Sequence, residues 1–359
     1  MASDGTVNWQ YPRSNSPERA VAFRWLGRTL NDDRYLQLGC EYARRLMADP
    51  VRGIYQNEDQ RVRGGVWYWR DVGLYMTNYT MRVPPAFLHL SEQTGDETFR
   101  EMAILSGQFM LNMMGPVGIP EAGCVAEDKA AAPLDAADLE RWLPANRINS
   151  RVGYATWTFA ALANATGDGA YAEACDRLLR ALARLQHDDG GFGQDWRTDR
   201  LEELDPTIKQ HFLAYMIYGL ARTCQCMPDS EPARTVTGKL SAFLMDRARR
   251  CGGLCYGDWF DDPPAGPEGL WRATTPDATP GLAVAARVLN DPSLLDMAKR
   301  IAAQHLSRSL DCPDRPDLHG AVPIYLRRDV TRPYCGGHFH FWLILGLMEI
   351  EASERALRR

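Results

Sequence analysis

The sequence predicts an all-α protein whose helical hairpins form an (α/α)6 toroid. The first observation is a short turn that carries an aspartate and recurs at intervals of 64, 72, 61 and 62 residues. Such a recurrence indicates one supersecondary unit repeated along the chain. The second observation is that apolar and amphipathic helical segments alternate on either side of these turns. The third is that the long, chemically rich loops all fall between one hairpin and the next. The turn aspartates are Asp32, Asp96, Asp168, Asp229 and Asp291.

Each turn has residues that end one helix and begin another. A Gly or Asn ends a helix in the left-handed conformation, and the Asp that follows accepts N–H hydrogen bonds at the start of the next helix. Thr94-Gly-Asp96 and Thr166-Gly-Asp168 show both features. We therefore expect a first helix, a tight turn and a second helix in each repeat.

The first helix of each hairpin is expected to lie inside, because its sequence is apolar on most sides, as in 212–221 and 341–348. The second helix carries charges along one stripe, as in 171–185, and is expected in a solvated outer ring. The predicted inner helices are 17–30, 74–93, 152–165, 208–226, 277–289 and 337–354. The predicted outer helices are 33–48, 97–114, 169–187, 231–250 and 292–308.

A closed toroid is favoured over an open helical solenoid because of where the loops fall. Since the helices alternate in direction, all the long connections lie at one end of the molecule and the short turns at the other. No linker or low-complexity stretch divides the 359 residues, so we expect a single domain, 1–359. The long connections are 49–73, 115–151, 188–207, 251–276 and 309–336.

Composition excludes several classes of function. A formal net charge of −5 provides no global field for nucleic acid. The N-terminal segment lacks the basic and apolar regions of a secretory signal, and no apolar run reaches the length of a membrane span, so a soluble cytoplasmic protein without membrane partners is expected. The oligomeric state is left open.

The nine cysteines are odd in number and scattered, which is typical of reduced core residues rather than a disulfide framework. Cys224-Gln-Cys226 and Cys251-Gly-Gly-Leu-Cys255 have some resemblance to metal-ligand spacing, but buried thiols are the favoured interpretation. We predict no metal and no cofactor.

Aromatic and arginine residues are concentrated in the loops that precede the inner helices. Aromatic faces suit sugar rings or prenyl chains, and a planar guanidinium binds carboxylate or phosphate through two hydrogen bonds. Surface ion pairing with loop carboxylates should account for about half of these arginines, so an arginine surplus would favour an anionic substrate. The predicted substrate-binding residues are Trp67, Trp69, Arg70, Asn149, Arg151, Tyr154, Trp271, Arg272 and Tyr334.

The acid–base candidates stand near the starts of inner helices, which should converge on the mouth of the toroid. Helix capping is the competing explanation for Asp71 and Asp277. His338 and His340 flank Phe339 and therefore cannot both face the cavity. The predicted catalytic residues are Asp71, Asp277, His211 and His338.

The Thr-Gly-Asp turns and the segment Leu185-Gln-His-Asp-Asp-Gly-Gly-Phe192 resemble the repeats of carbohydrate-active (α/α)6 enzymes, including unsaturated-uronyl hydrolases and toroidal polysaccharide lyases. For a hydrolase, the resemblance implies an Asp acid–base, carried by Asp71 or Asp277. For a lyase it implies His211 with Tyr75 or Tyr154 as base and acid. In either case Arg151 or Arg272 would neutralise the uronate carboxylate.

A second resemblance is to terpene cyclase and prenyltransferase toroids, through Gln186-His-Asp-Asp-Gly-Gly-Phe192. In a class II cyclase an Asp-rich segment opens an inner helix, and Thr275-Pro-Asp-Ala-Thr-Pro280 has that position, with Asp277 as the implied acid. A third possibility is a toroid that binds a protein or glycan without catalysis. The favoured function is a glycoside hydrolase or polysaccharide lyase acting on an anionic, uronate-containing saccharide.

Overall fold

The computed structural model confirms the predicted toroid of helical hairpins. It describes residues 17–48, 53–56, 58–69, 72–130, 143, 146–208, 210–251, 270–272, 276–307, 325–327 and 337–358. The inner helices are α1 (Glu18–Leu30), α4 (Val83–Thr94), α7 (Ala155–Thr166), α9 (Gln210–Cys226), α11 (Thr279–Leu289) and α13 (Gly337–Leu357). The outer helices are α2 (Asp33–Ala48), α5 (Glu97–Asn112), α8 (Gly169–Leu185), α10 (Glu231–Cys251) and α12 (Pro292–Leu306).

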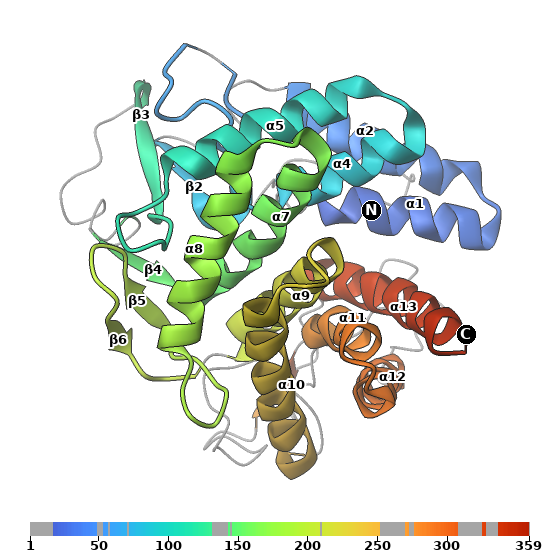
Figure 1. Cartoon of the computed structure of the whole chain (residues 1–359). Helices are drawn as coiled ribbons and strands as arrows, with labels where there is room; N and C mark the ends of the chain where they lie inside the picture. Colours follow the sequence, from blue (N-terminus) through green and yellow to red (C-terminus); the bar gives the residue numbers. More distant parts are fainter. Residues whose placement is uncertain are drawn as a thin grey trace.

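The inner helices form a closed ring, as Figure 1 shows from α1 round to α13. Each inner helix packs against the next one along the chain, and α13 packs against α1. Each outer helix packs against the inner helix that precedes it, from α2 on α1 to α12 on α11. Contact between the first and last helices excludes the open solenoid.

The turns work as their residues predict. Gly95 and Gly167 end α4 and α7 with φ of 70° and 72°, which is the left-handed region that glycine adopts at no steric cost. The carboxylate of Asp96 accepts a hydrogen bond from the Thr98 N–H at the start of α5, and Asp168 caps α8 in the same way. At the fourth turn, by contrast, it is the Ser230 hydroxyl that accepts from a backbone N–H of the first turn of α10.

The predicted inner helix 74–93 is wrong at its start. Residues Val72–Met76 form strand β2, a short helix α3 (Thr77–Thr80) follows, and α4 begins only at Val83. Gly73, just before the predicted start, has φ of 60°, which no α-helix contains, and the β-branched Val72 and the aromatic Tyr75 suit a strand. Pro84 and Pro85 then start α4, because the first helical turn tolerates proline.

Small antiparallel sheets, which the sequence analysis did not predict, order the long connections. The first joins β1 (Trp67–Trp69), β2 and β3 (Gly123–Ala130). The second joins β4 (Arg147–Asn149), β5 (Asp195–Arg197) and β6 (Glu203–Asp205). The third pairs β7 (Leu270–Arg272) with β8 (Tyr325–Arg327). Six of these eight strands have three residues each, which is too short for the two-residue alternation of a strand to stand out in the sequence.

Close packing of α9 on the 3-10 helix η1 (Ser150–Tyr154) fixes the backbone that precedes α7. A Cβ atom added to Gly219 would lie 2.4 Å from the Cα atom of Tyr154, which requires one element to move. On the outer helix α10, a Cβ atom added to Gly238 would meet no atom within 4 Å.

We expect Gly219→Ala to lower the free energy of unfolding by about 1–3 kcal/mol, because overpacking a close contact forces a backbone shift. Gly238→Ala is the matched control and should raise it by about 0.5–1 kcal/mol, because alanine favours a helix interior. Denaturant unfolding of both variants measures the difference. Equal effects of the two substitutions would contradict the close approach of α9 and η1.

No helix in the described ranges is long and apolar enough to cross a membrane. The prediction that residues 1–359 form one domain stays a prediction.

Candidate active site

Polar and aromatic side chains from the starts of all six inner helices gather inside the toroid. They come from the first two turns of each helix or from the residues just before it, so the alternation of hairpins brings together residues far apart in sequence. Hydrogen bonds and ring contacts connect them in the pairs given below. Glu18 belongs to α1, Arg82 precedes α4, Tyr154 precedes α7, His211 belongs to α9, Asp277 precedes α11, and Trp342 belongs to α13.

The centre of the site is a pair made by His211 and Asp277. The Nδ1 atom of His211 lies 2.6 Å from the Oδ2 atom of Asp277. The side chain of Asp277 is 1% exposed and that of His211 is 14% exposed. Asp277 lies in the 3-10 helix η2 (Pro276–Ala278), and its other oxygen, Oδ1, is buried without a hydrogen-bond partner. A hydrogen bond at this distance needs a proton on one of the two atoms, so either the imidazole or the carboxyl group is the donor.

The surroundings of Asp277 favour its protonated form. Burial raises the pKa of Asp277 well above its usual range, and the nearby positive charge of Arg82 acts in the opposite direction. A carboxyl group in this state exchanges a proton more readily near neutral pH than an exposed aspartate does. Asp277 and His211, each predicted to be catalytic, are thus in contact, and their catalytic role stays a prediction.

An aromatic wall stands beside the pair. The ring of Tyr215 lies edge-on to His211, with centroids 5.1 Å apart, and also edge-on to Trp342, with centroids 4.8 Å apart. Tyr215 and Trp342 are both buried. This packing fixes the imidazole plane and leaves it little rotational freedom.

A buried ion pair packs against the rings of Tyr215 and Trp342. The Nε atom of Arg82 donates to Oε1 of Glu18 over 2.6 Å, and both side chains are at most 4% exposed. The hydroxyl of Tyr154 donates to the same oxygen over 3.2 Å. Burial lowers the pKa of Arg82, but the charge and hydrogen bond of Glu18, together with Tyr215 and Tyr154, more than offset this and raise the pKa overall, so the guanidinium stays charged. Burial also raises the pKa of Tyr154 well above its ordinary value, with Glu18 adding to the shift.

Arg151 packs on two aromatic residues that adjoin His211. Its guanidinium carbon lies 4.4 Å from the ring centroid of Phe212, the neighbour of His211, and 5.9 Å from that of Tyr215. Asn149 accepts hydrogen bonds from the backbone N–H and from Nε of Arg151, which holds the side chain in place. Within the described part of the chain, no carboxylate forms an ion pair with Arg151.

Other loop arginines are paired, as expected for about half of them. Arg61 pairs with Asp59, and Arg197 pairs with Asp199. Arg147 of β4 pairs with the nearly buried Asp195 of β5. By contrast, Arg151 is half-buried and has no carboxylate partner among the described residues.

The remaining predicted site residues are not brought to this pair by any described contact. Trp67 is 3% exposed and belongs to the hydrophobic core. The residues Arg70, Asp71 and Tyr334 lie outside the described part of the chain, as do the side chains of Trp69, Trp271, Arg272 and His338. Their predicted roles stay predictions.

Sequence reasoning missed Glu18, Arg82, Tyr215 and Trp342 as site residues. All four lie in or beside apolar segments that are typical of the buried part of an inner helix. A usable signal is the charged residue at the start of an otherwise apolar inner helix, as in Met81-Arg82-Val83. Such a charge needs a buried partner, and Glu18 opens the helix next to it.

The cysteine pattern does not assemble a metal centre in the part of the chain that the structure describes. The Sγ atom of Cys224 lies 3.3 Å from Oγ1 of Thr237 inside the hairpin of α9 and α10. The side chain of Cys251 and all of Cys255 fall outside the described residues.

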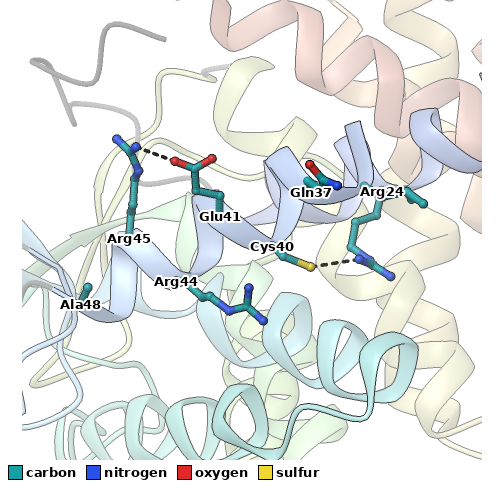
Figure 2. Close-up of a pocket in the computed structure, with 8 residues that line it drawn as sticks. Arg24, Gln37, Cys40, Glu41, Arg44, Arg45 and Ala48 are labelled. Atoms are coloured by element: carbon teal, nitrogen blue, oxygen red, sulfur yellow. Dashed lines mark hydrogen bonds and ion pairs between the residues drawn. The ribbon is translucent and has the colours of Figure 1, made fainter. Parts of the chain in front are cut away.

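A surface groove of about 500 Å³ lies elsewhere, along α1 and α2 (Figure 2). Arg24 reaches across it and donates to Sγ of Cys40 over 3.0 Å and to Oε1 of Gln93 over 3.0 Å. Arg45 pairs with Glu41 over 2.5 Å. None of the residues that line this groove belongs to the group at the inner-helix starts.

No protein-family model and no curated protein matches the sequence. Solved structures, however, match nearly the whole chain. An unsaturated glucuronyl hydrolase from Bacillus sp. GL1 is 13% identical, with a TM-score of 0.64 over 96% of this chain and 86% of that chain. Another unsaturated glucuronyl hydrolase, specific for heparin, is 11% identical, with a TM-score of 0.63 over 99% and 90%. A cellobiose 2-epimerase from Bacillus thermoamylovorans B4167 is 12% identical, with a TM-score of 0.66 over 94% and 87%.

At these identities the similarity shows the fold. It confirms the predicted resemblance to the toroids of unsaturated-uronyl hydrolases, and the all-α toroid itself.

Proposed function

We propose that this protein is a carbohydrate-active enzyme that acts on an anionic, uronate-containing saccharide by proton transfer at the His211–Asp277 pair. The observation that carries the proposal is that the pair shares its aromatic neighbours, Phe212 and Tyr215, with Arg151, a guanidinium for which the described residues supply no carboxylate.

The pair has the parts that general acid–base catalysis needs. A buried carboxyl group holds the imidazole through Nδ1, so Nε2 is the ring atom that would exchange a proton with a substrate. His211 is the more exposed member of the pair, and this fits a role in which it contacts the substrate while Asp277 orients it. The proton between the two residues can move as the charge on His211 changes.

The charge around the pair favours an anion. Arg151 can bind a carboxylate through two parallel hydrogen bonds. The N-terminal ends of the inner helices converge on the same region, and their dipoles add positive potential there. A uronate carboxylate held by Arg151 would place the sugar ring next to His211.

The names of the similar structures support a saccharide as substrate, since they include two glucuronyl hydrolases and a cellobiose epimerase. The comparisons give no support to the terpene cyclase interpretation of Asp277. A site with Glu18, Arg82 and Arg151 also suits an ionic, hydroxylated ligand better than a polyene.

Product analysis tests the proposal and identifies the reaction. The purified protein is incubated with saturated and unsaturated uronate oligosaccharides and with neutral oligosaccharides of the same linkage. Hydrolysis of an unsaturated uronate removes its ultraviolet absorbance, elimination creates that absorbance, and epimerisation changes the sugar without altering it. Conversion of uronate saccharides by any of these routes supports the proposal, whereas conversion of neutral saccharides alone contradicts it.

Arg151→Gln should weaken binding of a uronate saccharide about 10- to 100-fold, because a charged hydrogen-bond pair is lost. It should leave binding of the matching neutral saccharide unchanged. Isothermal titration calorimetry measures both. Arg197→Gln is the control, since Arg197 stands at the end of strand β5, which pairs with β4, and is already paired with Asp199. If both variants bind the uronate as tightly as the wild type, Arg151 is not the carboxylate site.

A further inference from the structure

The interior of the toroid contains polar atoms that no protein group satisfies. Among the described residues, Oε2 of Glu18, Nη2 of Arg82 and Nε1 of Trp342 are buried without a hydrogen-bond partner. The three residues are 2%, 3% and 0% exposed. Buried polar groups in folded proteins are nearly always hydrogen-bonded, so a group of unpaired ones in one place indicates a ligand or a bound water.

The three residues form one contiguous cluster. Arg82 is joined to Glu18 through Nε and Oε1, 2.6 Å apart. The guanidinium carbon of Arg82 lies 5.9 Å from the ring centroid of Trp342. Trp342 in turn packs on Tyr215, and Tyr215 packs on His211. We call this cluster the floor of the candidate active site, because Tyr215 connects it to His211.

The available atoms match one hydroxyl group. Arg82 and Trp342 each offer an N–H donor, and Glu18 offers an acceptor. A hydroxyl group accepts two hydrogen bonds and donates one, so it satisfies all three atoms at once. An anion would face the Glu18 carboxylate, and a cation would face Arg82. Because Glu18 and Arg82 neutralise each other, the floor selects an uncharged polar group.

We propose that Glu18, Arg82 and Trp342 form a subsite that receives one uncharged hydroxyl group of the substrate. This inference rests on the proposed saccharide substrate. The two parts of the site then bind different groups of the substrate. Arg151 binds the carboxylate, and the floor binds one hydroxyl group and so fixes the orientation of the sugar ring. The burial of all three side chains fits a subsite for a single group rather than for a whole ring.

The test uses Trp342→Phe, which removes the indole N–H and keeps an aromatic ring against Tyr215. Trp196→Phe is the matched control. Trp196 is also 0% exposed with an unpaired Nε1, but it lies on β5 and packs against Phe192. The probes are three pairs of monosaccharides: glucuronate with glucose, galacturonate with galactose, and mannuronate with mannose. Isothermal titration calorimetry identifies the pair that binds the wild type, and the variants are compared on that pair.

We expect Trp342→Phe to weaken binding of both members of the pair by the same factor, about three- to tenfold, as for one lost hydrogen bond. Trp196→Phe should bind both as the wild type does. This pattern differs from that of Arg151→Gln, which should affect the uronate alone. If Arg151→Gln weakens the uronate and Trp342→Phe changes neither sugar, the subsite is wrong and the proposed function stands. If Trp342→Phe weakens binding of the neutral sugar, but the wild type binds the uronate no more tightly than the neutral sugar, the proposed function is wrong and the subsite stands.

A second measurement needs no variant. Monodeoxy forms of the neutral sugar, each lacking one hydroxyl group, are titrated into the wild-type protein. The form that lacks the hydroxyl bound at the floor should bind about tenfold more weakly or worse, because the three buried groups then stay unpaired in the complex. Equal affinity for every deoxy sugar would overturn the subsite and assign the floor to a water molecule. Absence of binding for all three pairs would overturn both proposals.

Discussion

Replacing Asp277 with Asn is expected to lower kcat by about 10²- to 10⁴-fold on the uronate saccharide that the protein converts. The amide offers a permanent N–H donor to Nδ1 of His211 in place of the carboxyl oxygen that lies 2.6 Å away. The pair then loses the state in which Asp277 accepts a hydrogen bond from His211. Without that state the imidazole cannot gain and release a proton during the reaction. Steady-state kinetics of the variant measure the loss.

The fold should survive this change, because Asn has the size of Asp and removes a buried carboxyl whose ionisation is unfavourable. The helical circular dichroism and the melting temperature are expected to stay near those of the wild type. Asp168→Asn is the control, since Asp168 caps α8 at an exposed turn and Asn caps equally well. Full activity in Asp277→Asn would remove this residue from the mechanism, and a collapse of the melting temperature would reassign it to folding.

The largest expected effect on stability comes from Glu349, at the short-turn end of the inner helices. Its side chain is 1% exposed and pairs with Arg222 of α9 and with Arg287 of α11, the latter over 2.8 Å. The hydroxyl of Tyr218 donates to it over 3.0 Å. Glu349→Ala should lower the free energy of unfolding by about 3–5 kcal/mol, because two largely buried guanidinium groups lose their counter-charge.

Denaturant unfolding of the variant at neutral pH measures this effect. Glu41→Ala is the control, since Glu41 and its partner Arg45 are 52% and 48% exposed and an exposed pair contributes little. An equally small change for both variants would show that the three helices are held together by apolar packing alone.

The same carboxylate predicts a pH dependence of stability. Burial alone would raise the pKa of Glu349, but Arg222 and Arg287 outweigh it and lower the pKa below the ordinary value of 4.5. The contribution of Glu349 is therefore fully present above about pH 4.5 and is lost as the pH falls through its lower native pKa. The wild type should lose its stability advantage over Glu349→Gln in that acidic window. A constant difference between the two proteins down to pH 2 would contradict the lowered pKa.

The sequence was most informative about the helices. Outer helix α2 has the predicted bounds of 33–48, because its turn carries both an Asn that ends one helix and an Asp that starts the next. The predicted helix over 74–93 was wrong at its start, where strand β2 continues from Gly73, whose positive φ no composition pattern shows. Closure of the ring depends on contact between α1 and α13, which local periodicity cannot establish.

The candidate site could be predicted only in part. His211 and Asp277 were identified because they stand at the starts of inner helices among polar residues. Glu18 and Arg82 were missed because each is a single charge at the edge of an apolar segment, and only the fold shows that they neutralise each other. Their pairing depends on the contact between α1 and α4, which a sequence read one segment at a time does not show.

The most direct test of the account is the ratio of kcat/KM for a uronate oligosaccharide to that for the neutral oligosaccharide of the same linkage, measured on the wild-type protein. The account predicts that the uronate is converted at least about tenfold more efficiently, because the guanidinium of Arg151 contributes charged hydrogen bonds only to the carboxylate. A ratio near one would contradict the assignment of Arg151 and of the anionic substrate.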